Sequence, residues 1–216
     1  MNVTAIIPAY NEEQTIANVV NCVKNVDKIQ KIIVVSDGSS DMTAEIAKKC
    51  GAEVIELNEN IGKGGAIKAG INKCKTEIIL FLDADLIGLT EKHILSLIEP
   101  VIENDADMTI GIFKNGRIAT DLAQKVSPYL SGQRAIKRSI IDKIPNIDIT
   151  RYGVETALTK YLKRTSARIQ EVDLPEMTHL TKEEKLGIIK GVQERLRMYW
   201  DIVKTLSNYN IKKESK

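Results

Sequence analysis

The stretch that decides the fold is Ile78-Ile79-Leu80-Phe81-Leu82-Asp83-Ala84-Asp85, where an apolar run leads directly into two carboxylates. An apolar run of this length is typical of a strand buried on both faces of a sheet. Open α/β sheets bind ligands at the carboxyl ends of their strands. Two neighbouring carboxylates repel each other unless a cation lies between them, and a hard divalent metal is the usual one. The stretch therefore predicts a metal at a sheet edge; the simpler alternative is an acidic strand end that caps a loop.

Strand-like and helix-like segments alternate on both sides of this stretch. The predicted strands are Val3–Ala9, Lys31–Ser36, Glu53–Leu57, Glu77–Leu82, Asp107–Phe113 and Arg168–Asp173. The predicted helices are Glu12–Lys24, a segment from the Ser39-Ser40-Asp41 cap to Cys50, Gly64–Lys73, Glu91–Glu103 after the cap Thr90, Ala119–Val126, Ala135–Lys143, Tyr152–Lys163 and Lys182–Ser207. This alternation predicts an α/β fold with a mostly parallel sheet and right-handed crossovers.

Composition is that of an ordinary soluble domain. The chain has 216 residues, 43% of them apolar and 28% charged, with a net charge of +2, so there is no reason to expect nucleic-acid binding. Cys22, Cys50 and Cys74 fall in or at the end of predicted helices, which favours buried free thiols and a cytoplasmic location. No segment approaches the roughly 18 apolar residues of a membrane-spanning helix. The first predicted strand begins at Val3, so we expect no signal peptide.

Four motifs in order resemble those of nucleotide-sugar glycosyltransferases of the GT-A fold, in particular family 2. They are Ile6–Glu13, Ile33–Asp41, Asn60–Ala66 and Asp83–Asp85. The second half is similar to glucosyl-3-phosphoglycerate synthases in Gly132–Arg138, Ile144-Pro145, Tyr152–Glu155, Val172–Leu174 and His179. Dolichyl-phosphate mannose synthases share the first half equally well, so the acceptor stays open.

The resemblance implies a role for each group of matching residues. Nucleotide-sugar contacts are implied for Pro8, Ala9, Tyr10, Glu12, Ser36, Asp37, Lys63, Asp83, Ala84 and Asp85. Acceptor contacts are expected of Arg117, Gly132, Arg134 and Tyr152. Asp85 and His179 would hold Mg²⁺ or Mn²⁺ against the diphosphate, with Asp83 toward the ribose, and Glu155 would be the catalytic base.

The nucleotide-binding residues also have structural interpretations. Asn11 and Glu12 suit the start of a helix, as a cap and as an acid at the positive end. Asp37 could accept the imide N–H of uracil or simply begin an Asp-Gly turn, and Ser36 stands where the family often has a further acid. Lys63 precedes a helix in a glycine-rich loop and adds a charge for a diphosphate or a base carbonyl, unless it is merely solvated.

The acceptor-side residues are open to similar alternatives. His179 is either a metal ligand or a lone surface histidine, whereas His93, in a first helical turn, is expected to be an ordinary surface histidine. Glu155 is a base, an orienting group, or an acid favoured by the helix dipole; Thr156 stands where a second acid is common. Arg134 and three other cations suit either a phosphorylated acceptor or exposed helix faces. The other three are Arg117, Lys137 and Arg138.

The segment Lys182–Ser207 combines an apolar stripe with interspersed basic residues. It predicts a long helix packed across the domain, or alternatively a helix that contacts the inner membrane surface or a second copy in a homodimer.

These features predict a single GT-A domain, 1–216, with a nucleotide-sugar half (1–113), an acceptor and metal half (114–181) and a C-terminal helix and tail (182–216). The expected activity is metal-dependent transfer of a hexose from UDP-glucose or a related UDP-sugar to an acceptor, either a phosphorylated small molecule or a polyprenyl phosphate. The alternatives are a non-catalytic nucleotide-sugar-binding protein and a nucleotidyltransferase. A nucleotidyltransferase normally carries its glycine-rich loop directly after the first strand, where this chain has Pro8–Asn11.

Overall fold

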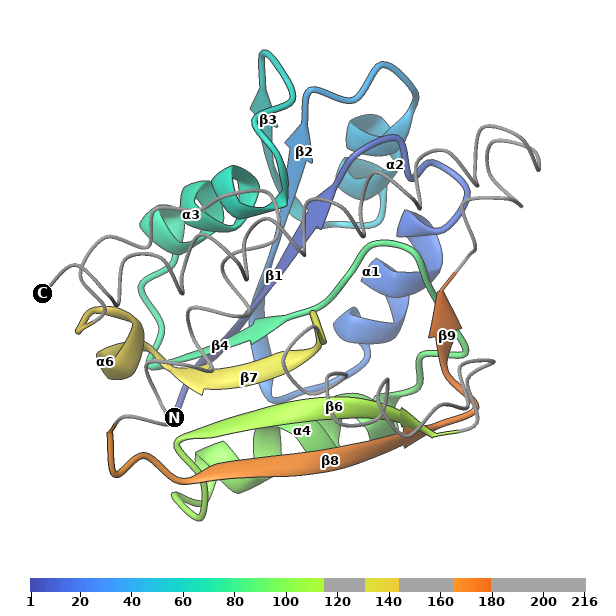
Figure 1. The fold of residues 1–216 in the computed structure, drawn as a ribbon. Helices are drawn as coiled ribbons and strands as arrows, with labels where there is room; N and C mark the ends of the chain where they lie inside the picture. The colour runs from blue at the N-terminus through green and yellow to red at the C-terminus, as the bar shows by residue number, and fades with distance from the viewer. Residues whose placement is uncertain (115–130, 144–164, 180–216) are drawn as a thin grey trace, which may run out of the picture. The chain divides into compact units, whose positions relative to one another are not determined.

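A computed structural model describes residues 1–114, 131–143 and 165–179 of the chain (Figure 1). All of these residues except His179 belong to one compact unit, Met1–Thr178. Seven strands form one sheet in the order β3-β2-β1-β4-β7-β6-β8. They are β1 (Val3–Ala9), β2 (Ile29–Asp37), β3 (Glu53–Leu57), β4 (Ile78–Phe81), β6 (Met108–Lys114), β7 (Arg134–Lys137) and β8 (Ile169–Pro175). Only β7 runs against its neighbours, so the mostly parallel α/β sheet is confirmed.

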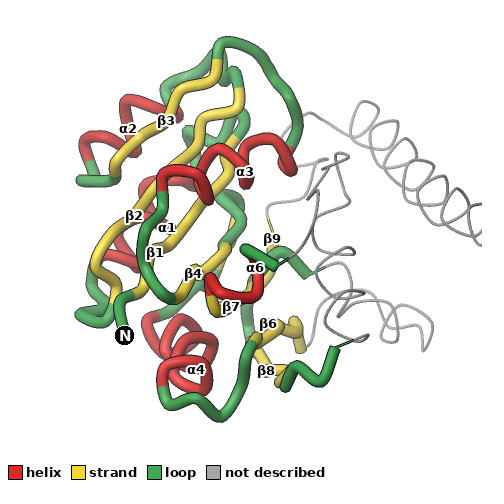
Figure 2. Tube along the Cα trace, turned by 90° about the vertical axis from the view of Figure 1, so that its left-hand side faces the viewer, coloured by secondary structure: helices red, strands yellow, loops and turns green. Residues whose placement is uncertain are grey.

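Helices cover both faces of this sheet, as Figure 2 shows. The described helices are α1 (Ile16–Lys24), α2 (Thr43–Lys49), α3 (Lys63–Lys73), α4 (Glu91–Ile102) and α6 (Arg138–Ile141). Because successive strand residues point to opposite faces, β1 buries Ala5 and Ile7 against α1 and α4 but Ile6 against α3. The two apolar cores explain why the strands read as continuous apolar runs rather than as alternating ones.

The predicted helix Ala135–Lys143 is wrong in its first part. Residues Arg134–Lys137 form β7, which inserts between β4 and β6, and only Arg138–Ile141 is helical. The two neighbouring strands supply ladder hydrogen bonds on both sides of β7, and this long-range pairing overrides the weak local preference of a four-residue segment. Leu86–Ile87 and Thr178–His179 form a further small sheet of β5 and β9, which the sequence did not predict.

Two predicted helix starts also differ from the structure. Helix α1 begins at Ile16 rather than Glu12, because a turn comes first in which the Thr15 and Ile16 N–H groups donate to the Glu12 carbonyl. Helix α2 has Met42 as its N-cap, although the Asp41 carboxylate still accepts from the Thr43 backbone N–H at 3.0 Å. The predicted cap at Thr90 is confirmed.

The three cysteines match the expectation of buried free thiols only in part. Cys22, Cys50 and Cys74 are free thiols, but only Cys74 is fully buried.

Within the described ranges, no helix is long and apolar enough to cross a membrane. The predicted helices Ala119–Val126, Tyr152–Lys163 and Lys182–Ser207 lie outside those ranges.

Candidate active site

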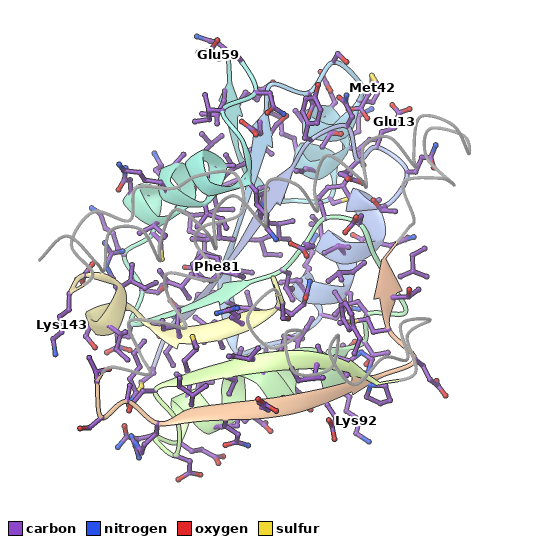
Figure 3. All side chains as sticks on the ribbon, viewed as in Figure 1. Glu13, Met42, Glu59, Phe81, Lys92 and Lys143 are labelled. Atoms are coloured by element: carbon purple, nitrogen blue, oxygen red, sulfur yellow. The ribbon has the colours of Figure 1, made fainter. Side chains whose placement is uncertain are left out.

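The loops that follow β1, β2 and β3 meet at one edge of the sheet. Figure 3 shows Glu13, Met42 and Glu59, one from each loop, at this same end. Because these strands are parallel, their carboxyl ends share an edge, which is where such sheets bind ligands. The nucleotide-binding residues predicted from the first two motifs are therefore close to this edge.

The residues at the end of β1 differ in exposure. Pro8 and Ala9 belong to β1, and Ala9 pairs with Ser36 of β2; both members of that pair are buried. Tyr10, the next residue, is 49% exposed. Tyr10 thus presents an aromatic ring at the edge, whereas the Ser36 side chain lies in the interior and does not offer an open surface to a ligand.

Reciprocal hydrogen bonds tie the loop after β1 to the loop after β2. The side-chain oxygen of Asn11 accepts the Ser40 N–H at 2.9 Å, and the Asn11 N–H donates to the Ser39 hydroxyl at 3.2 Å. The Glu12 N–H donates to the Thr43 hydroxyl at 2.8 Å. Asn11 adopts a φ of 55°, a left-handed conformation that asparagine tolerates better than most residues. Asn11 therefore joins two loops and does not cap α1.

Asp37 organises the loop that leads into α3. Its side chain is buried, and its two carboxylate oxygens accept the N–H groups of Ile61 and Gly62, each at 2.9 Å. Gly38 has a φ of 68°, and a Cβ there would lie 2.6 Å from the Asn60 nitrogen, so the turn requires glycine. The chain bends at Gly38 directly after β2, where a turn was one expectation, and Asp37 aligns the start of α3; base recognition by Asp37 stays a prediction.

Three motifs converge on the carboxylate of Asp83, just beyond β4. Lys63, the first residue of α3, lies with Nζ 2.7 Å from Oδ1 of Asp83. The side-chain amide of Gln133 donates to Oδ2 at 3.0 Å. A Cβ on Gly132 would lie 2.6 Å from each Asp83 oxygen and 2.7 Å from Lys63 Nζ, so a larger residue there would displace these side chains. The structure thus joins the glycine-rich loop, the Asp-Ala-Asp motif and the segment before β7.

The register of the sheet explains this convergence. β7 is antiparallel to β4, with Arg134 opposite Phe81. Continuing the pairing by two residues places Gly132 opposite Asp83. The segment predicted to face the acceptor therefore meets the motif predicted to bind the donor because β7 runs in reverse.

The metal-binding prediction rests on Asp85 and His179. Asp85 is half-buried next to the buried Ala84. Gly88 lies against the Glu176 carbonyl, 2.5 Å from where its Cβ would be, so the chain just before His179 passes beside the chain just after Asp85. His179 is in β9, but its side chain lies outside the described part of the structure.

The donor atoms at this edge suit a divalent cation. Carboxylate oxygens are ligands that Mg²⁺ and Mn²⁺ accept, and Asp85 supplies them at the end of β4. Among the described side chains, no three His, Cys, Asp or Glu residues gather closely enough to hold a metal ion. The remaining ligands would have to come from a bound diphosphate or from side chains beyond the described ranges, such as that of His179.

The other histidine, expected to be an ordinary surface residue, is instead buried and caps a helix. His93 is buried in α4, where its N–H donates to the Thr90 hydroxyl and its Nδ1 accepts the Thr90 N–H, both at 3.3 Å. Burial lowers the pKa of His93 below its ordinary value, and a backbone hydrogen bond to Pro175 partly opposes this.

Two of the four basic residues considered for a phosphorylated acceptor, Lys137 and Arg138, instead contact other parts of the fold. Lys137 lies 2.5 Å from Asp107, and Arg138 donates to the Cys74 and Ile71 carbonyls at the carboxyl end of α3. Arg134 is only 1% exposed and its Nε donates to the Ser131 carbonyl at 2.7 Å, so it is not on an exposed helix face. Arg117, Tyr152 and Glu155, the remaining acceptor-side and catalytic predictions, lie outside the described residues.

Comparison with known proteins identifies the family. The family model described as "Glycosyl transferase family 2" matches residues 4–162. The chain belongs to this family. The match spans the three converging motifs and β7, so the resemblance seen in the sequence is confirmed.

Several relatives share parts of the chain. An uncharacterised protein of Methanocaldococcus jannaschii is 40% identical over 213 residues, which is 86% of each chain. The dolichyl-phosphate beta-glucosyltransferase of Drosophila melanogaster is 40% identical over 101 residues, 39% of this chain and 31% of that protein. The undecaprenyl-phosphate 4-deoxy-4-formamido-L-arabinose transferase of Edwardsiella ictaluri is 32% identical over 152 residues, 65% of this chain and 46% of that one. The matches thus span less than half of the two named enzymes.

Solved structures of the same fold include glucosyl-3-phosphoglycerate synthase from Mycobacterium tuberculosis, in complex with Mn²⁺, uridine diphosphate and phosphoglyceric acid. Its TM-score to this chain is 0.72 at 25% identity, over 83% of this chain and 70% of the synthase. The GT-A fold expected from the sequence is thereby confirmed.

Proposed function

We propose that the chain is a metal-dependent glycosyltransferase that moves a hexose from a nucleotide sugar, UDP-glucose or a related UDP-sugar, to a phosphorylated acceptor. The observation that carries this proposal is the contact of Lys63, Asp83 and Gly132 at the carboxyl edge of the sheet. Donor-side and acceptor-side segments of a family 2 chain meet there, as a group-transfer reaction requires.

The start of α3 is the proposed diphosphate site. Asp37 holds the backbone of Ile61 and Gly62, so the first turn of α3 is fixed relative to β2. The N–H groups of this turn and the ammonium of Lys63 favour an anion. The nucleoside would lie toward Tyr10 and Glu12, which the first motif places at the neighbouring loop.

The two aspartates have separate proposed roles. Asp85 and His179 would hold a divalent cation, and Asp83 would face the ribose. When bound, the cation supplies positive charge that offsets the charge developing on the departing nucleoside diphosphate. Lys63, next to Asp83, would contribute a further positive charge.

The acceptor side is less constrained. Glu155 is the proposed base or orienting carboxylate, and Arg117, Arg134 and Tyr152 are proposed to contact the acceptor together with Gly132. Phosphoglyceric acid accompanies the Mycobacterium synthase structure, and the names of the Drosophila and Edwardsiella relatives specify polyprenyl phosphates. A phosphate is common to these acceptors, and transfer assays with 3-phosphoglycerate and with a detergent-solubilised polyprenyl phosphate separate the two classes.

Calorimetric titration with UDP- and GDP-sugars, with and without Mn²⁺, tests the donor. Asp85→Ala should remove the metal-dependent part of the affinity, whereas the control Asp27→Ala, an exposed acid between α1 and β2, should bind as the wild type does. Absence of binding to every nucleotide sugar in the presence of Mn²⁺ would reject the proposal. Binding without transfer or hydrolysis would instead favour the non-catalytic nucleotide-sugar-binding alternative.

The nucleotidyltransferase alternative is less well supported. The glycine-rich loop of this chain follows β3, and the loop after β1 is built on Asn11 and its hydrogen bonds. Contact of the segment Lys182–Ser207 with the cytoplasmic face of a membrane or with a second copy remains a proposal. Sedimentation with anionic liposomes and sedimentation equilibrium test these two possibilities.

A further inference from the structure

Gln133 is a buried amide that contacts Asp83. It directly precedes β7 and is 0% exposed. Its Nε2 lies 3.0 Å from Asp83 Oδ2. An ionised carboxylate only accepts hydrogen bonds, so the amide nitrogen and not the oxygen must face Asp83. Gln133 therefore donates a hydrogen bond to Asp83 without adding charge.

The remainder of Gln133 is fixed to the sheet. Its carbonyl accepts the Gly111 N–H of β6 at 2.8 Å, and its Oε1 lies 3.2 Å from the Ser131 hydroxyl. That hydroxyl also lies 2.7 Å from the Gly111 carbonyl, so its proton is shared between two acceptors. A side chain at Gly111 is excluded, because its Cβ would lie 2.3 Å from Leu174. The amide is thus anchored at both its backbone and its side-chain end.

Asp83 is consequently held by groups of different mobility. Oδ1 pairs with Lys63, whose flexible side chain can turn toward a diphosphate, and Oδ2 accepts from the anchored Gln133. We infer that Gln133 is the positioning residue that keeps the Asp83 carboxylate oriented when Lys63 engages the donor. This inference rests on the proposed function, because its first test measures donor affinity. The contact between Gln133 and Asp83 is present in the protein without a ligand.

The absence of charge on the Gln133 amide matters for this role. A lysine or arginine at position 133 would neutralise Asp83, whereas a glutamate would place a second carboxylate against it. Glutamine alone combines a donor with zero charge at this length. Because Gln133 is 0% exposed, it would act on the donor only through Asp83.

A double-mutant cycle in donor affinity tests the coupling. Gln133→Ala should weaken binding of the nucleotide sugar by about tenfold in the wild-type background. In the Asp83→Ala background the same change should have less than about a twofold effect, since the group it positions is gone. Gln133→Glu, which keeps the side-chain volume but places a second carboxylate against Asp83, should lose more than Gln133→Ala. Equal effects of Gln133→Ala in both backgrounds would overturn the inference.

Two controls separate positioning from stability. Thr109→Val removes two buried hydrogen bonds, from the Thr109 hydroxyl to the Leu97 carbonyl at 2.6 Å and from the Ala135 N–H to that hydroxyl at 3.3 Å, and should lower Tm without changing donor affinity. In the ligand-free protein, the carboxyl ¹³C resonance of Asp83 should move in Gln133→Ala and stay in Thr109→Val. An unmoved Asp83 resonance in Gln133→Ala would also overturn the inference. Failure of the wild type to bind any nucleotide sugar would reject the proposed function, and the resonance would still decide the contact.

Discussion

Replacing Gly132 with alanine places a methyl group where Lys63 and Asp83 meet. The added Cβ would lie 2.6 Å from both Asp83 oxygens and 2.7 Å from Lys63 Nζ. Restoring ordinary van der Waals contact requires movements of about 0.8 Å. Movement of Lys63 relieves only the contact with Nζ, so the Asp83 carboxylate, which Gln133 holds at Oδ2, must shift as well. A shift of that size lengthens the 2.7 Å ion pair beyond hydrogen-bonding distance.

The energetic effect follows from the loss of this contact. A charge-assisted hydrogen bond contributes about 1.5–3 kcal/mol, which partial exposure of the two side chains reduces to roughly 1–2 kcal/mol. If the pair shapes the donor site, Gly132→Ala should weaken nucleotide-sugar binding by roughly 5- to 30-fold. Stability should fall by a similar or smaller amount, because Lys63 is 30% exposed and can find water.

Gly70→Ala is the matched control. Its Cβ would lie 2.5 Å from Cγ2 of Ile6, a comparable clash in the same helix that carries Lys63, but in the apolar core. Overpacking there should cost about 1–3 kcal/mol of stability and leave donor affinity unchanged. Calorimetry and chemical denaturation of both variants give the two quantities. The reasoning is refuted if folded Gly132→Ala binds the donor as the wild type does, or if Gly70→Ala loses as much affinity.

Two further substitutions test the framework around the site. Asp37→Asn replaces one of two oxygens that accept backbone N–H groups with a donor, so it should lower stability by about 2 kcal/mol. If Asp37 only aligns the loop, UDP- and GDP-sugars weaken equally; a change in base preference would show that it reads the base. Arg168 and Lys137 hold the pKa of Asp107 well below its ordinary value, so Asp107 stabilises the fold above about pH 4 and loses this effect as pH falls toward the lowered pKa. Asp107→Asn should therefore cost about 1–3 kcal/mol in denaturation at pH 7, and the difference should shrink below pH 4; a constant difference would contradict the assignment.

The parallel half of the fold was predictable because its signals are local. Val3–Ala9 and Glu53–Leu57 match their predicted bounds, since each is a short segment rich in β-branched and other apolar residues that turns or loops bound. β7 was not predictable in the same way, because both of its neighbours, β4 and β6, are distant in sequence. A four-residue segment has too little periodicity to reveal a strand whose stability comes from such neighbours.

The residues of the candidate site also divide into those that local sequence predicts and those that depend on contacts between distant segments. Lys63 and Asp83 were recognisable from a charge beside glycines and from carboxylates after an apolar strand. Asp37 accepts hydrogen bonds from two N–H groups of the loop that follows β3. No pattern in the sequence links that loop to Asp37. Gln133 was missed for a related reason: an uncharged amide becomes informative only when the carboxylate to which it donates is known.

The reversed direction of β7 is what makes one site from two halves of the chain. In a parallel sheet each carboxyl edge gathers residues that follow strands, and Asp37 and Asp83 both arrive in this way. The antiparallel strand β7 begins at this edge, next to the end of β4. The residues that precede β7, Gly132 and Gln133, therefore lie at the same edge. A register shift of β7 by two residues would put Arg134 opposite Asp83 and add a buried cation to the pair with Lys63. The pairing of four residues in β7 therefore determines the charge at the site as well as its shape.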